Sequence, residues 1–215
     1  MSVELQRVAP ADIEARSMEI IQQELGGRVL PEENKAVILR AIHTTADFDY
    51  ADNLVFSPGA VAKGVAAFQA GADIVTDTTM AMSGINKRVL GKFGGQVHNF
   101  IADPAVAAAA KERGVTRATV SMERAAEMGK HLVYAIGNAP TALVRLYELW
   151  QEGKLPEPAL IIGVPVGFVN VVEAKELILQ MDCPYIVARG RKGGSNVAAA
   201  ICNALLYTAS QNERE

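Results

Sequence analysis

The chain has 215 residues, half of them hydrophobic, so it is long enough to bury one sizeable core. Its formal net charge of −3 provides no broad basic field of the kind that attracts nucleic acid or an anionic membrane. We therefore expect a single domain over residues 1–215, with a frayed tail from about residue 210, and neither nucleic acid nor membrane as a partner.

Residues 1–10 contain neither the apolar stretch nor the small-residue cleavage site of a secretory signal. The most apolar window, 158–172, is interrupted by Pro165 and Asn170 and is too short to span a bilayer. These features indicate a cytoplasmic protein.

Three helices are predicted in the first third of the chain. The first covers about 11–25 and stops at Gly26, and the second starts at Pro31 and runs past Ile42. The third follows Pro58 and closes at Gly71, with apolar residues at helical spacing between them.

Beyond residue 71, short apolar runs rich in Val and Ile alternate with helical stretches. The runs are 72–76, 96–101, 131–136, 159–164 and 185–188. This alternation predicts an α/β protein with three layers, α/β/α, and a parallel sheet of about five strands, flavodoxin-like or Rossmann-like. In such folds ligands bind beyond the carboxyl ends of the strands, so the loops that follow the strands are the candidate site.

The loop after the first predicted strand, 76–88, concentrates hydroxyl groups, one carboxylate and two cations. It either binds a ligand or forms an Asp/Thr turn that caps the next helix. Its candidate binding residues are Thr78, Thr79, Ser83 and Gly84.

The next two loops each have two interpretations. After the third strand, Asn138 or Ala139 can cap a helix with Pro140 in its first turn, and the free amides there either bind a carboxylate or simply start the helix. After the fourth strand, the apolar segment 163–170 either lies against a flat apolar ligand or packs a tight strand-to-helix turn.

The loop after the fifth strand contains the cations Arg189, Arg191 and Lys192 around a Gly-rich turn, and Ser195 precedes an apolar helix. Composition and position predict an anion site here. The chain has no G-x-x-x-x-G-K-[ST] motif and no G-x-G-x-x-G after the first strand, so nothing in it supports a nucleotide site.

Two polar side chains of the first helices are further candidates. His43 shares a predicted helix face with Arg40 and Asp47. Such a face can carry a catalytic histidine, and a solvated polar face would look the same. Ser17 lies on the apolar stripe of the first helix, where its hydroxyl needs its own helix carbonyl or a ligand as partner. His98 and His131 are interpreted as structural, and two aspartates without a histidine predict no bound metal.

Five of these segments together resemble the precorrin-8X methylmutase family. The resemblance rests on residues 43–50, 76–88, 136–143, 163–170 and 190–196, and extends from Ile13 to about Tyr207. Several of the segments look closer to the cobalt-precorrin-8 enzymes than to the other branch of the family.

The resemblance implies an isomerase of cobalamin biosynthesis that moves a methyl group from C-11 to C-12 of a corrin precursor, without a cofactor. The product would be cobyrinate, or hydrogenobyrinate when cobalt is absent. The implied substrate is an apolar tetrapyrrole fringed with carboxylates, which Arg40, Lys87, Arg88 and the cations of the last loop can bind.

The resemblance also assigns roles to single residues. His43 falls on the family's catalytic histidine, and Ser17 and Arg40 fall on substrate contacts. The family forms homodimers, and Arg117 would reach across the subunit boundary. The alternative function is a non-catalytic tetrapyrrole carrier, and a second alternative is a nucleotide- or flavin-dependent α/β enzyme.

Overall fold

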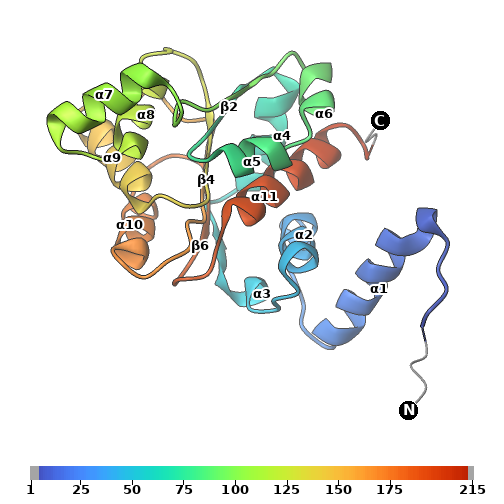
Figure 1. Ribbon diagram of the computed structural model, residues 1–215. Helices are drawn as coiled ribbons and strands as arrows, with labels where there is room; N and C mark the ends of the chain where they lie inside the picture. Colours follow the sequence, from blue (N-terminus) through green and yellow to red (C-terminus); the bar gives the residue numbers. More distant parts are fainter. Residues whose placement is uncertain (1–4, 213–215) are drawn as a thin grey trace.

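The computed structural model describes residues 5–212 (Figure 1). Its strands are β1 (Leu54–Phe56), β2 (Ile74–Thr76), β3 (Val97–His98), β4 (Val133–Ile136), β5 (Leu160–Gly163) and β6 (Tyr185–Ala188). Its helices are η1 (Pro10–Asp12), α1 (Ile13–Leu25), α2 (Lys35–Thr45), α3 (Tyr50–Asn53), α4 (Ala60–Gln69), α5 (Thr79–Gly84), α6 (Lys87–Lys92), α7 (Pro104–Arg113), α8 (Arg117–Ala126), α9 (Pro140–Gln151), α10 (Val171–Ile178) and α11 (Ser195–Ala209).

The strands form one sheet in the order β1-β6-β5-β4-β2-β3. The five strands from β2 onward are mutually parallel, which confirms the predicted parallel sheet. Counted along the chain, their spatial order is the 2-1-3-4-5 order of flavodoxin-like folds. The direction of winding therefore reverses between β2 and β4, and open sheets of this kind bind ligands at such a point, beyond the carboxyl ends of the strands.

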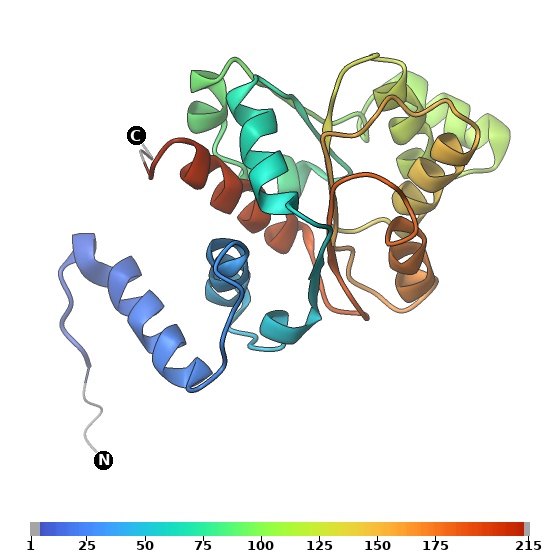
Figure 2. The ribbon, with the colours of Figure 1, turned by 180° about the vertical axis from the view of Figure 1, so that it is seen from behind.

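Helices cover both faces of the sheet, as the three-layer prediction requires (Figures 1 and 2). Successive strand residues point to opposite faces, so Ala135 belongs to one core cluster while Tyr134 and Ile136 belong to the other. The first cluster packs under α2, α4 and α11, and the second packs under α8, α9 and α10. These two cores hold the strand ends rigidly in place.

Three details differ from the sequence-based expectations. The sheet has a sixth strand, β1, which pairs antiparallel with β6 and was missed because three residues after a short helix carry no readable pattern. Helix α2 begins at Lys35 and not at Pro31, since Pro31 accepts a hydrogen bond from the Asn34 amide in a turn. Strand β3 is shorter than residues 96–101.

Helix α1 lies at the side of the molecule and packs mainly on α2 (Figures 1 and 2). Gly26, with a positive φ of 60°, ends it as predicted. Ile21 and Leu25 are buried, but Ile13, on the same predicted apolar stripe, is 54% exposed. Among the helices within residues 5–212, none has the length and apolar character needed to cross a bilayer.

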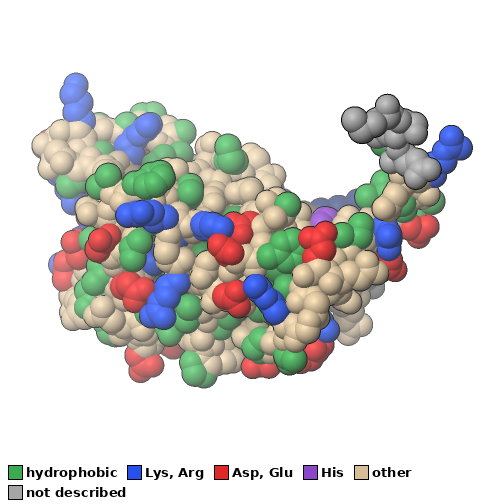
Figure 3. Space-filling model, turned by 90° about the horizontal axis from the view of Figure 1, so that it is seen from below, with side chains coloured by type: hydrophobic (Ala, Val, Ile, Leu, Met, Phe, Trp, Pro, Cys, Tyr) green, Lys and Arg blue, Asp and Glu red, His purple; other side chains and the backbone are tan. Residues whose placement is uncertain are grey.

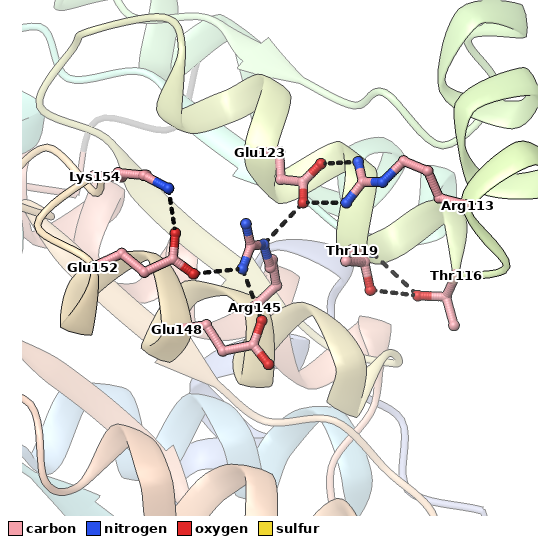
Figure 4. Close-up of polar contacts among 8 residues, drawn as sticks. All are labelled: Arg113, Thr116, Thr119, Glu123, Arg145, Glu148, Glu152 and Lys154. Carbon is pink, nitrogen blue, oxygen red and sulfur yellow. Dashed lines mark hydrogen bonds and ion pairs between the residues drawn. The ribbon is translucent and has the colours of Figure 1, made fainter.

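An ionic network holds the helices that cover the second face together (Figure 4). Glu123 of α8 accepts hydrogen bonds from Arg113 of α7 and from Arg145 of α9, the latter at 2.9 Å. Arg145 also contacts Glu148 and Glu152 at 2.9 and 3.2 Å. The hydrogen bonds from Arg113 hold the pKa of Glu123 below its usual value, with Arg145 adding to the effect against the opposing effect of burial.

Candidate active site

The loops that follow β2, β5 and β6 contact one another at the carboxyl edge of the sheet. The hydroxyls of Thr78 and Ser195 are 2.8 Å apart and share a hydrogen bond. The Gly194 amide donates to the Val164 carbonyl at 2.9 Å. These three loops therefore lie together at one edge of the sheet.

Asp77 joins the loop after β2 to the loop after β4. Its carboxylate, 2% exposed, accepts hydrogen bonds from the amides of Gly137, Asn138 and Ala139 at 2.9, 2.8 and 2.6 Å. Of the two interpretations of this loop, the binding of a ligand carboxylate by these amides is not supported, because Asp77 already accepts their hydrogen bonds. Burial raises the pKa of Asp77, and the three amide bonds offset part of that rise.

Two glycines allow the loops to approach this closely. A Cβ on Gly137 would lie 2.6 Å from the Ser195 Cα, and one on Gly193 would lie 2.1 Å from the Val164 carbonyl oxygen. Both obstacles belong to backbone and cannot rotate away. The Gly-rich sequence at this edge thus serves close backbone packing.

His43 and Ser17 line the same pocket, between α1 and the end of α2. The pocket has a volume of about 240 Å³, and its remaining wall comes from Ile20, Ile21, Glu24, Ile42, Ala46 and Phe48. His43 is half-buried in the last turn of α2. The Ser17 hydroxyl donates to the Ile13 carbonyl at 2.9 Å, so its own helix supplies the partner that the apolar stripe requires.

The predicted polar face around His43 is only partly formed. Arg40 and His43 lie on α2, but the helix ends at Thr45 and Ala46 adopts a left-handed conformation, so Asp47 lies beyond the helix. Arg40 is paired with Glu14 of α1 at 2.7 Å, and its guanidinium lies 5.4 Å from the centre of the Tyr207 ring. It therefore stands where α1, α2 and α11 meet.

The three cations of the last loop have different partners. Lys192 pairs with Asp47 and Asp49 at 2.6 and 2.7 Å, and Arg189 pairs with Glu176 at 2.9 Å. Arg191 lies over the ring of Phe168 at 5.6 Å, and within residues 5–212 it has no acidic partner. The side chain of Phe168 is 83% exposed, so this part of the edge presents an apolar surface beside a cation. Seen from below the view of Figure 1, hydrophobic and positively charged side chains lie side by side on the surface (Figure 3).

The other candidate residues are either exposed or hydrogen-bonded to neighbouring backbone and side chains. Thr79, Ser83 and Asn138 are exposed, and the Gly84 carbonyl accepts a hydrogen bond from Asn203 of α11. Arg117 begins α8 and donates to the Ile101 carbonyl at 3.3 Å. The substrate contacts assigned to these residues, and to Ser195 and the three cations, remain predictions.

The interpretation of His98 as structural agrees with its contacts. His98 and Lys130 both bind the buried carboxylate of Asp73, at 3.1 and 2.6 Å, at the amino end of β2. This lies at the edge of the sheet opposite the candidate site. Over the part of the chain that the structure describes, no three His, Cys, Asp or Glu side chains are grouped to hold a metal ion.

Comparisons with known proteins match nearly the whole chain. The cobalt-precorrin-8 methylmutase of Salmonella typhimurium is 46% identical, covering 92% of this chain and 95% of that protein. The precorrin-8X methylmutase of Pseudomonas aeruginosa is 41% identical, with 88% and 91% covered. The crystal structure of precorrin-8x methyl mutase from Thermus thermophilus superposes with a TM-score of 0.85 at 40% identity, covering 93% of this chain and 98% of that one.

The family model of precorrin-8X methylmutase matches residues 12–208, a span that includes the His43 pocket and every loop of the carboxyl edge. The match, the identities and the superposition agree with one another and with the resemblance of the five segments. This chain belongs to the precorrin-8X methylmutase family.

Proposed function

We propose that this protein is a cobalt-precorrin-8 methylmutase, an isomerase that moves a methyl group from C-11 to C-12 of the corrin precursor. The observation that carries the proposal is the shared pocket of Ser17 and His43, formed where α1 meets α2 in a chain of this family. A non-catalytic carrier would need the cations and the apolar surface, but it would not need an imidazole at a pocket wall.

His43 is the candidate acid and base. A 1,5 methyl shift needs no nucleophile, but protonating the conjugated ring near the migrating carbon makes it electron-poor and lowers the barrier. An imidazole with a reference pKa near 6.5 can give that proton and recover it at neutral pH. Such a transfer typically contributes about 10² to 10⁴ in rate, and holding the ring in its reactive shape supplies the remainder.

The substrate's carboxylates must compete with the protein's own acids for several cations. Arg40 is held by Glu14 and Lys192 by two aspartates, whereas Arg191 has no acidic partner within residues 5–212 and stands beside the exposed Phe168. Arg191 is therefore the cation of this loop that a carboxylate can bind without displacing an acid. A well-formed charged hydrogen bond there contributes roughly 1.5–3 kcal/mol.

The proposal includes a cytoplasmic homodimer. The His43 pocket, about 240 Å³, is smaller than the range of roughly 300–1,000 Å³ of pockets for drug-sized ligands, so it can hold only part of a macrocycle. Helix α1 forms one wall of this pocket and leaves Ile13 exposed. A second subunit against α1 would cover that residue and enlarge the site, and Arg117 is the residue expected to reach across.

The test is incubation of the purified protein with cobalt-precorrin-8. A mutase changes the absorption spectrum irreversibly and with turnover, whereas a carrier only shifts it in proportion to the bound fraction. His43→Ala should abolish turnover while preserving the circular dichroism spectrum and ligand binding. Full activity of that variant would exclude His43 as the acid, and a comparison of rates with the metal-free substrate decides whether cobalt is required.

A further inference from the structure

Lys175 is a fully buried lysine in the middle of α10, with 0% of its surface exposed. No carboxylate within residues 5–212 pairs with it; its ammonium donates to the carbonyls of Gly190 and Lys192 at 2.7 and 2.8 Å. Burial lowers the pKa of Lys175 to about 8. A buried cation without an acid is costly, so its position calls for a physical reason.

The two hydrogen bonds from Lys175 bind the backbone of one turn, residues 190–192. Between them, the Arg191 carbonyl accepts a hydrogen bond from the Gly167 amide at 3.2 Å. Three successive carbonyls of the turn, at Gly190, Arg191 and Lys192, therefore each accept a hydrogen bond from another part of the chain. The side chains of Arg191 and Lys192 consequently face outward from a fixed backbone.

The turn of residues 190–192 also holds the wall of the His43 pocket in place. The Lys192 ammonium binds Asp47 and Asp49, and the Asp49 amide donates to Asp47 at 3.0 Å. Ala46 and Phe48, which flank Asp47 in the chain, both line that pocket. A continuous series of contacts thus runs from Lys175 through Lys192 to the residues beside His43.

We infer that Lys175 is a positioning residue of the proposed methyl shift: it fixes the backbone of Lys192, whose ammonium holds the pocket wall formed by Ala46 and Phe48. The inference rests on the proposed function, because the reaction supplies its kinetic readout. Lys175 touches neither the pocket nor His43, so it acts only through this series of contacts.

Lys175→Met is the informative variant, because it keeps the length of the side chain and removes the charge and the donors. Exchanging a buried charge for an apolar group of similar volume is often neutral or stabilising. Removing the ammonium leaves the carbonyls of Gly190 and Lys192 without this donor, but methionine avoids the cost of burying a charge, which offsets that loss. The variant is therefore expected to fold, as the unfolding midpoint in urea will show.

We expect Lys175→Met to lower kcat for cobalt-precorrin-8 about tenfold or more, as small misplacements near a reacting group do. Lys63→Met, the same change at an exposed lysine of α4, is the matched control and should stay within about twofold of the wild type. A folded Lys175→Met variant with wild-type kcat would overturn the inference.

A double-mutant cycle separates positioning from a general structural role. If Lys175 acts through Lys192, adding Lys175→Met to Lys192→Met should lower kcat by no more than about twofold further, since neighbours in one network are not additive. Multiplicative losses would contradict the proposed series of contacts.

Hydrogen exchange gives a readout that does not depend on the substrate. In Lys175→Met, amides of 189–194 and of 47–49 should exchange faster, while those of α8 stay unchanged. Faster exchange confined to α10 would also overturn the inference. If the wild-type protein leaves cobalt-precorrin-8 unchanged, the proposed function fails, and the exchange comparison still decides whether Lys175 fixes the pocket wall.

Discussion

Removing the carboxylate of Asp77 should destabilise the protein more than removing an ordinary helix cap. In Asp77→Ala, one buried and two part-buried amides lose their acceptor, and each unsatisfied group costs about 1–3 kcal/mol. The wild-type protein also carries the desolvation cost of a buried carboxylate, which the variant avoids, so the net loss is smaller than the sum. We expect a loss of about 3–5 kcal/mol in the free energy of unfolding.

Urea unfolding of the wild type and the variant measures this difference, with comparable m-values showing that the same surface is exposed. At about 2–4 °C per kcal/mol for a chain of this size, Tm should fall by roughly 10 °C. Asp103→Ala is the control, because Asp103 caps α7 through the Ala105 amide in a more exposed place and should cost about 1 kcal/mol. Equal losses in the two variants would refute the argument that burial makes the Asp77 bonds strong.

Three further predictions concern the substrate, the carboxyl edge and acid stability. Arg40→Ala should raise the Kd for substrate more than it lowers the rate of the bound reaction, and an unchanged Kd in titration would exclude a contact there. Gly193→Ala should lower kcat/KM at least about tenfold, because its Cβ would meet the Val164 carbonyl; wild-type kinetics would contradict this. The pKa of Glu123 is lower in the folded protein than its unfolded value of 4.5. The ionised Glu123 therefore stabilises the fold above pH 4.5, and this contribution is lost as the pH falls through the folded-state pKa. In urea unfolding, the wild type should therefore exceed Glu123→Gln by about 1 kcal/mol at about pH 7 and lose that advantage as the pH falls below 4.5 through the lowered pKa of Glu123.

The pattern of residues was sufficient to predict the layers and most of the elements. Runs of Val and Ile between helical stretches predicted the five parallel strands, and β6 begins and ends at the predicted residues. Hydrophobic period and turn residues act over a few positions, so they can be read locally. The same locality explains why β1 was missed, because its three residues become a strand only through pairing with β6.

The candidate residues could be named from the sequence, but their partners could not. Lys192 and Asp47 are distant in the chain, and nothing in either segment indicates that they form an ion pair. The same holds for Asp77, whose acceptor role depends on amides that β4 brings to it.

Local composition therefore decided which chemical groups stand at the carboxyl edge, whereas folding decided which of them remain available to a ligand. The physical reason is that charges and amides are satisfied by whatever the packed chain brings within hydrogen-bond distance. Arg191 has no acidic partner among the described residues while Lys192 is held by two aspartates, although the two cations are adjacent in the sequence.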